Sequence, residues 1–275
     1  MDDRTELSQF LKSRRARLRP EDVGLPDYGG VRRVAGLRRE ELARLAGVSI
    51  AHYTRLEQGR GDSVSDEVLD AIGAALRLDT DELAYLHRIA RRPPRCAKAA
   101  ASANVRPGLR YLLESFVLTP ALLVGRHTQI VGWSRLAVAV FGDFTAWPED
   151  RRTISHLLFT DSYLRDLHGA GWERAASEHV AHLRVLLGRF RGDAGLAAHI
   201  DHMREVSMEF ARMWAEHPVG QVRSREYVLN HPVVGELTLH GELIALPDEP
   251  SCCGLDLFAA EPGSASEEAL RRLAG

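Results

Sequence analysis

Residues 38–60 contain two stretches of helical apolar spacing, separated by a tight turn. The apolar residues of these stretches fall on one helix face: Leu42, Leu45, Ala46, Val48, Tyr53 and Leu56. Gly47 stands where the first helix must end, a position at which the backbone often takes a positive φ. Ser49 stands at the N-cap of the second helix, where its hydroxyl can accept a free backbone N–H. The pattern predicts a helix-turn-helix with an outward basic face.

Amphipathic segments on both sides of this motif predict three further helices. They cover residues 5–18, 65–78 and 79–92. Residues 19–37 are rich in proline and glycine and therefore predict a long loop. Five helices in the first 92 residues predict an all-α domain, 1–92, that buries a core of its own.

The pattern changes after a segment of proline, alanine and basic residues, which we interpret as a linker over residues 93–108. Beyond it, short β-like runs, several helical stretches and a second group of alternating β segments predict an α+β domain over residues 109–275. Strands are expected near 120–124, 128–133 and in three runs after 220; helices are expected near 109–117, 134–142, 153–160, 172–190, 194–204, 206–215 and 264–273. The alternation in residues 236–240 indicates an antiparallel sheet with one wet face.

Charge is distributed unevenly along the chain of 275 residues, whose formal net charge is −2. Residues 31–60 contain seven basic and three acidic side chains, so the basic excess is local to the predicted helix-turn-helix. A local basic excess of this kind suits contact with the grooves and phosphates of DNA.

In a helix-turn-helix, the outward residues at the start of the second helix reach base edges in the major groove. If Tyr53 and Leu56 point inward, Arg55 points outward and can address a guanine through both O6 and N7. The flanking arginines suit phosphates, which position the protein without reading sequence. The predicted DNA-binding residues are Arg32, Arg33, Arg38, Arg39, Arg44, Ser49, Ile50, Ala51, His52, Thr54, Arg55 and Arg60.

Several other classes of protein do not fit the sequence. It contains no apolar run long enough to cross a membrane and no secretory leader, so we expect a soluble, cytoplasmic protein without a membrane partner. Three cysteines, Cys96, Cys252 and Cys253, do not make a disulfide framework. The GxSxG, Walker-type, GxGxxG and HExxH motifs are missing, so we expect no catalytic residues and no cofactor.

Residues 37–60, LRREELARLAGVSIAHYTRLEQGR, resemble the Xre/Cro-type helix-turn-helix of bacterial repressors. The segments RRARLRPEDVGLP, VAGLRREELA, LRVLLGRF, FARMWAEHPV and HPVVGELTLHGELIALPDEPS extend the resemblance over nearly the whole chain, to the MmyB-like regulators of actinobacteria. The resemblance implies a DNA-binding head joined to a PAS-like ligand-binding domain, working as a dimer.

A sheet covered by helices can leave an apolar cavity in which a few polar groups fix a small ligand. The predicted ligand-binding residues are Trp133, Phe141, Arg152, His156, Phe159, Trp172, Phe210, Trp214, His217, Tyr227, His240 and Phe258. Two HxxH pairs, His179 with His182 and His199 with His202, are a weak signal for metal binding. We predict no metal site.

The sequence therefore predicts a one-component transcription regulator. We expect its partners to be a double-stranded DNA operator, a small apolar or amphipathic molecule and a second copy of the chain. Two alternatives remain open. One is an enzyme carrying a DNA-targeting head, with an acid–base or metal site in 109–262; the other is a regulator controlled by a partner protein.

Overall fold

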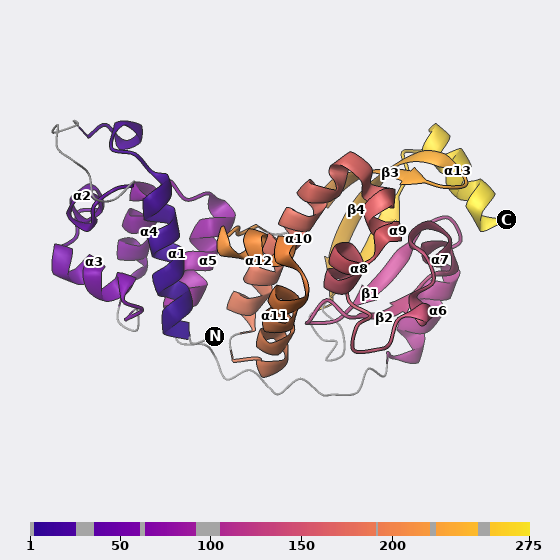
Figure 1. The fold of residues 1–275 in the computed structure, drawn as a ribbon, viewed down its shortest axis with the longest axis horizontal. Helices are drawn as coiled ribbons and strands as arrows, with labels where there is room; N and C mark the ends of the chain where they lie inside the picture. The colour runs from indigo at the N-terminus through magenta and orange to yellow at the C-terminus, as the bar shows by residue number, and fades with distance from the viewer. Residues whose placement is uncertain are drawn as a thin grey trace. The chain divides into compact units, whose positions relative to one another are not determined.

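A computed structural model describes residues 3–25, 36–60, 64–91, 105–190, 192–220, 224–246 and 254–275. The chain forms two compact units (Figure 1). The first comprises residues 1–96, 184–192 and 215–220, and the second comprises residues 97–183, 193–214 and 221–275. The first unit thus includes two segments that are distant in sequence from its helices. Most of the predicted linker lies outside the described residues.

The first unit is helical, as the sequence predicts. Its described elements are α1 (Asp3–Arg17), the short 3₁₀ helix η1 (Glu21–Val23), α2 (Arg39–Leu45), α3 (Ile50–Glu57), α4 (Asp66–Ala75) and α5 (Thr80–Ala90). Side-chain caps begin three of these helices: Ser49 for α3, Ser65 for α4 and Asp79 for α5. Gly47 takes the left-handed conformation expected of it, with φ of 65°, and so ends the turn between α2 and α3.

The core of the helix-turn-helix differs from the prediction at one position. Leu42, Tyr53 and Leu56 are fully buried, as the apolar spacing predicts. Leu45, however, is 37% exposed, and Ala43 is buried in its place. The buried face of α2 is therefore set by residues 42, 43 and 46, because the small Ala43 side chain allows close packing against neighbouring helices.

A buried polar cluster joins α1 and α5 to residue 184 within the first unit. The Glu6 carboxylate accepts hydrogen bonds from Tyr85 Oη and Arg184 Nη1, each at 2.6 Å. All three side chains are buried. Because a buried charge is costly unless it is paired, this ion pair defines the position of residue 184 in the core.

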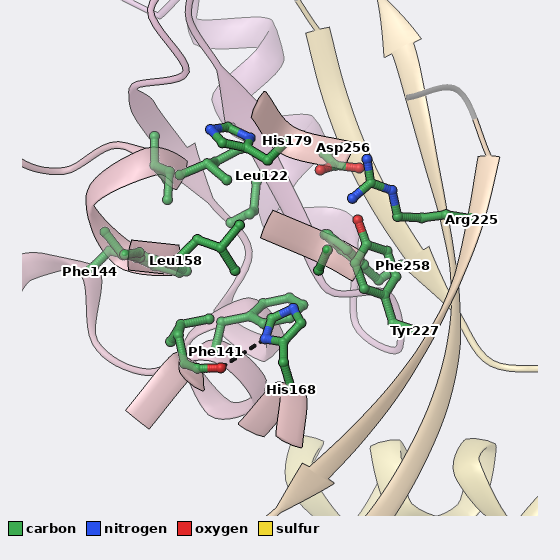
Figure 2. A pocket seen from close by; sticks show the side chains of 15 residues that line it. Leu122, Phe141, Phe144, Leu158, His168, His179, Arg225, Tyr227, Asp256 and Phe258 are labelled. Carbon is green, nitrogen blue, oxygen red and sulfur yellow. Dashed lines mark hydrogen bonds between the residues drawn. The ribbon is translucent and has the colours of Figure 1, made fainter. Parts of the chain in front are cut away.

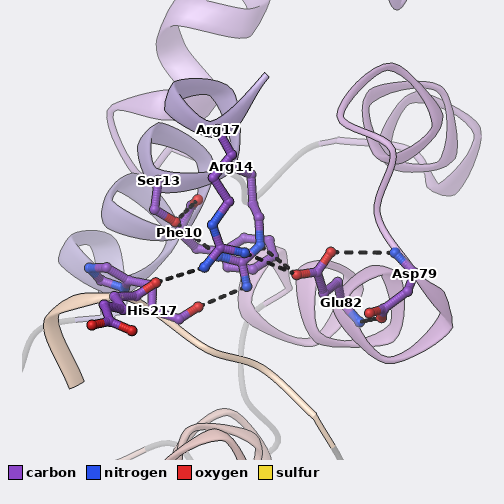
Figure 3. Close-up of polar contacts among 8 residues, drawn as sticks. Phe10, Ser13, Arg14, Arg17, Asp79, Glu82 and His217 are labelled. Carbon is purple, nitrogen blue, oxygen red and sulfur yellow. Dashed lines mark hydrogen bonds and ion pairs between the residues drawn. The ribbon is translucent and has the colours of Figure 1, made fainter. Parts of the chain in front are cut away.

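A second group of polar contacts in the same unit is centred on the buried Arg14 side chain (Figure 3). The Arg14 guanidinium packs 4.6 Å from the Phe10 ring centroid, and its Nε lies 2.8 Å from Glu82 Oε1. Arg14 Nη2 donates to the backbone carbonyl of His217 at 2.8 Å. Arg17 Nη2 similarly donates to the carbonyl of Glu216. Residues 216 and 217 are thus bound to α1 through their backbone.

The second unit is an α+β domain. Its described elements are α6 (Pro107–Ser115), β1 (Ala121–Val124), β2 (Ile130–Trp133), α7 (Arg135–Phe141), η2 (Phe144–Ala146), α8 (Ile154–Thr160), α9 (Ser162–His168), η3 (Gly169–Gly171), α10 (Trp172–Arg189, of which residues 184–189 belong to the first unit), α11 (Ala194–Val206), α12 (Met208–Ala215), β3 (Ser224–His231), β4 (Gly235–Ala245), β5 (Gly254–Ala259) and α13 (Ala265–Ala274). The sequence pattern did not predict α9. In the described part of the chain, no helix has both the length and the apolar character needed to span a lipid bilayer.

The five described strands form one antiparallel sheet in the order β2-β1-β5-β4-β3. Leu122 and Val124 of β1 point into the larger core, which includes residues of α7, α8, α9 and α13. Ala121 and Leu123, one residue out of phase, join a smaller cluster with α6. Strand β1 is therefore buried on both faces, whereas β3 and β4 follow the predicted alternation with one wet face.

Candidate functional site

The first candidate site is the outward surface of α3 (Figure 1). Ser49 Oγ accepts the backbone N–H of His52 at 3.1 Å, which fixes the start of the helix. Ile50, Ala51 and Arg55 are exposed, while His52 and Thr54 are partly exposed. In a helix-turn-helix the N-terminal residues of the second helix reach base edges, and we predict that these five side chains face the DNA.

Basic side chains surround this helix. Arg38, Arg44, Arg55 and Arg60 are exposed, and within the described residues no ion pair engages the last three of them. Arg38 Nη1 lies 3.6 Å from Glu40 Oε1 and remains half-exposed. Arginine side chains that are held by no carboxylate are available to phosphates or guanine edges. Arg32 and Arg33 lie outside the described residues.

Arg39 has a different position from the one predicted for a simple phosphate contact. Its guanidinium is hydrogen-bonded to the carboxylate of Glu57, the last residue of α3. Glu57 is 1% exposed and also accepts from Arg15 Nε at 2.8 Å. Burial opposes the charge on Glu57, yet the hydrogen bonds from Arg15 and Arg39 hold the pKa of its carboxyl below the usual range. Arg39 thus helps to fix the end of the recognition helix.

The second candidate site is a cavity of about 80 Å³ in the second unit (Figure 2). Because one water needs about 10–15 Å³ by this measure, the cavity has room for several waters or a small organic molecule. Its wall is mostly apolar, with a few polar groups. It is lined by Leu122, Ile130, Phe141, Phe144, Ile154, Leu157, Leu158, Leu164, His168, Ala175, His179, Arg225, Tyr227, Asp256 and Phe258.

The polar end of the pocket contains Arg225 of β3 and Asp256 of β5, two strands that flank β4 in the sheet (Figure 2). Arg225 Nη1 lies 3.4 Å from Glu178 Oε2, and its guanidinium lies 5.3 Å from the Tyr227 ring centroid. Among the described residues, no hydrogen bond or ion pair holds the Asp256 carboxylate. Burial raises the pKa of Asp256 to about 7, an increase that the Arg225 charge only partly offsets.

Two histidines complete the polar lining. His168 Nδ1 donates to the Leu164 carbonyl at 2.8 Å, so Nε2 carries the lone pair in the neutral ring. His179 Nε2 lies 2.9 Å from Ser155 Oγ. Burial lowers the pKa of both histidines, of His179 well below its ordinary value. Both rings are therefore neutral at pH 7.

Three of the predicted ligand-binding residues line this pocket: Phe141, Tyr227 and Phe258. The ring centroids of Phe141 and Phe258 are 4.8 Å apart, and those of Tyr227 and Phe258 are 5.4 Å apart. A Cβ at Gly241 would lie 2.6 Å from Tyr227 Cε2, so the absence of a side chain there allows the last two rings to approach across β4.

The other nine predicted residues lie elsewhere. Arg152 donates to the carbonyls of Phe144 and Trp147 and packs 5.3 Å from the Trp133 ring. A separate aromatic cluster contains Phe159, Trp172, Phe210 and Trp214. His240 is exposed on β4, and His217 belongs to the first unit, with its carbonyl bound by Arg14. His156 belongs to a histidine cluster.

The histidine cluster surrounds Ser155. Ser155 Oγ lies 2.9 Å from His199 Nε2 as well as from His179 Nε2. The His156 ring lies 5.7 Å from the His199 ring and 5.3 Å from the His202 ring. Burial lowers the pKa of His199 to about 3. In the described ranges, no group of three or more His, Cys, Asp or Glu side chains is arranged to hold a metal ion.

Two acidic residues of this domain, Asp161 and Glu173, do not line the pocket. Asp161 accepts the backbone N–H of Tyr163 at the start of α9. Glu173 is exposed and pairs with Arg212 at 2.9 Å. The pocket histidines His168 and His179 therefore have neither of these two carboxylates beside them in the pocket lining.

Sequence reasoning missed Arg225 and Asp256, although strand periodicity contains a signal for both. Arg225 is two residues before Tyr227 on β3, and Asp256 is two residues before Phe258 on β5. Side chains two residues apart on a strand share a face. The sequence analysis predicted the aromatic residue of each strand, Tyr227 or Phe258, as a ligand-binding residue. It did not predict the polar residue on the same face of the strand.

The comparison with known families agrees with this two-part organisation. Residues 6–86 match the model of a helix-turn-helix domain. Residues 105–273 match the model of the MmyB-like transcription regulator ligand binding domain. No curated protein matched the chain. Since the second match covers more than half of the sequence, the chain belongs to the family of MmyB-like transcription regulators, with a DNA-binding helix-turn-helix domain before the ligand-binding domain.

Proposed function

We propose that the chain is a one-component regulator that binds a specific operator as a homodimer and adjusts that binding when a small molecule occupies the pocket of the second unit. The observation that carries the proposal is the presence in one chain of an exposed basic recognition helix and a mostly apolar pocket with a few polar groups. We assign the chain no catalytic role.

The DNA-binding part of the proposal rests on α3. Arg55 is exposed and reads a base edge, while Ile50 and Ala51 contact thymine methyl groups. Arg38, Arg44 and Arg60 bind phosphates, which set the register of the helix in the groove. Arg39 contributes indirectly, because its ion pair with Glu57 fixes the end of α3.

The requirement for a second copy follows from the small number of base-reading side chains on α3. One domain of this size offers few specific contacts, and phosphate contacts alone give weak binding at physiological salt. Two recognition helices bind together when their half-sites are about 34–36 Å apart, one turn of DNA. Ligand binding can alter this spacing only if the ligand binds the two states with different affinities.

Spacing of the half-sites provides the test. DNA sequences that bind the purified full chain are selected from a random library, and five base pairs are then inserted between the two halves of the site. The proposal predicts a large loss of affinity, since the second half-site turns to the opposite face of the duplex. Equal affinity for the two spacings would reject dimeric binding.

Native mass spectrometry of the purified chain separates the ligand proposal from the two alternatives. A small molecule retained by the folded protein supports ligand control. An empty pocket together with a bound protein favours regulation by a partner protein. Turnover of the retained molecule, lost when His168 or His179 is replaced, favours the enzyme.

A further inference from the structure

The pocket contains one acidic group without a described partner. The Asp256 carboxylate faces the cavity from β5, and the described residues give it no hydrogen bond and no ion pair. Polar groups buried in a protein are usually hydrogen-bonded, because a buried polar group without a hydrogen bond costs free energy. A group that faces an open cavity without a partner is therefore available to a ligand.

Arg225 is the cation nearest to Asp256, but other groups already hold it. Its Nη1 lies 3.4 Å from Glu178 Oε2, and its guanidinium packs 5.3 Å from the centroid of the Tyr227 ring. A ligand carboxylate would have to compete with Glu178 for the same guanidinium and would lie beside Asp256. The pocket is therefore a poor site for an anion.

When Asp256 is ionised, the charged groups around the polar end of the pocket sum to a net negative charge. Arg225 is balanced by Glu178, and Asp256 adds a second carboxylate. The nearby His168 and His179 are neutral, because burial lowers the pKa of each ring. Arg174, 4.0 Å from Glu178, is 60% exposed and therefore largely screened by water.

We propose that the pocket binds a small apolar molecule carrying a protonated amine, with the ammonium group paired to the Asp256 carboxylate and the apolar body packed against Phe141 and Phe258. This inference rests on the proposed function, in which the pocket receives a ligand.

Titration calorimetry with three probes of similar shape tests the charge preference. Benzylamine, benzyl alcohol and benzoate are each titrated into the full chain at pH 8, where Asp256 is mostly ionised. We expect benzylamine to bind about tenfold or more tightly than benzyl alcohol, as a charge-assisted hydrogen bond implies, and benzoate to bind weakest. Tightest binding by benzoate, or no binding by any probe, would overturn the proposal.

The variant Asp256→Asn tests the residue. We expect it to lower the affinity for benzylamine about tenfold or more while leaving that for benzyl alcohol within about twofold. The control Asp166→Asn removes an exposed carboxylate of α9 that does not line the pocket, and it should leave both affinities unchanged. Unchanged benzylamine binding in a folded Asp256→Asn variant would reject the assignment.

A proton count on the unaltered protein gives a readout that does not depend on how a variant folds. Near pH 7, Asp256 is about half protonated, because burial raises its pKa to about 7. An ammonium bound beside it favours the ionised form, so benzylamine should release about half a proton. Calorimetry in two buffers of different ionisation enthalpy measures this number, and zero release would contradict the pairing. None of these results depends on the DNA experiment, so the proposed function and the amine preference can fail separately.

Discussion

Glu57 Oε1, at the buried end of the recognition helix, lies 2.8 Å from Arg15 Nε of α1. The same carboxylate is bonded to Arg39 at the start of α2. One acidic side chain therefore connects three helices of the DNA-binding domain. Its position explains why Arg39, although basic and half-exposed, is placed for more than phosphate contact.

Replacing Glu57 should loosen the recognition helix. In Glu57→Gln, the charge partner of both arginines is lost, and we expect local opening of α3 to become easier by about 1–3 kcal/mol. Hydrogen exchange measured on peptides spanning residues 50–57 of the full chain reports this change. The control Glu40→Gln, whose 59% exposed side chain pairs with Arg38 at the surface, should change exchange little. Equal effects of the two variants would contradict the role of Glu57.

Gly241 determines the shape of the pocket wall. In Gly241→Ala, the new methyl group would lie 2.6 Å from Tyr227 Cε2 and 3.4 Å from Phe258 Cε1, so the tyrosine ring must move. We expect this overpacking to destabilise the domain by about 1–3 kcal/mol and to weaken benzylamine binding. Scanning calorimetry measures the stability of the domain, and titration calorimetry measures its affinity for benzylamine. Gly108→Ala, with nothing within 4 Å of the added carbon, should have neither effect, and wild-type binding by Gly241→Ala would show that the ring position is unimportant.

The histidine cluster should make the second unit sensitive to acid. Burial lowers the pKa of His199 to about 3 and that of His179 well below its usual value, so the unfolded chain binds protons more readily than the native state. The stability these rings contribute is present above about pH 6.5 and is lost as the pH falls toward 3. At pH 5.5 the expected loss from His199 is about 1 kcal/mol, and His179 adds a loss of the same sign.

Thermal unfolding at pH 7.5 and 5.5 checks this prediction. His199→Asn, which cannot gain a proton, should reduce the difference between the two pH values, while His240→Asn at an exposed position should leave it unchanged. Asp256 contributes with the opposite sign, since its raised pKa stabilises the fold at lower pH, and Asp256→Asn removes that contribution. Identical pH dependence of wild type and His199→Asn would contradict the account.

The local pattern of apolar and polar residues was sufficient to predict most helices and strands of the fold. The helices of the first unit follow from amphipathic spacing and from caps such as Ser49, because these interactions are formed within a few residues. Helix α9 was missed because it begins one residue after α8 ends: Asp161 is both the C-cap of α8 and the N-cap of α9, so no loop pattern separates the two helices. The burial of Arg184 beside Glu6 depends on a contact between residues 178 positions apart, which no local pattern contains.

The two candidate sites also differ in how far local sequence pattern could predict them. The recognition helix is one continuous segment, so its outward residues could be predicted from their spacing. The pocket is assembled from α7, α8, α9, α10 and four of the strands, and its polar end depends on the strand register that places Asp256 opposite Leu243. Aromatic residues are frequent in any core, so selecting them by type found Phe141 and Phe258 but also the separate cluster around Phe210.

Arg55 provides the most direct test of the central claim that α3 reads the operator. The full chain, Arg55→Ala and the control Lys12→Ala, which removes an exposed charge from α1, are compared by fluorescence anisotropy on the selected DNA site and on random DNA. We predict that Arg55→Ala loses about 1–3 kcal/mol on the selected site, with a much smaller loss on random DNA, and that Lys12→Ala loses neither. If Arg55→Ala binds the selected site as tightly and as selectively as the unaltered chain, the account is wrong.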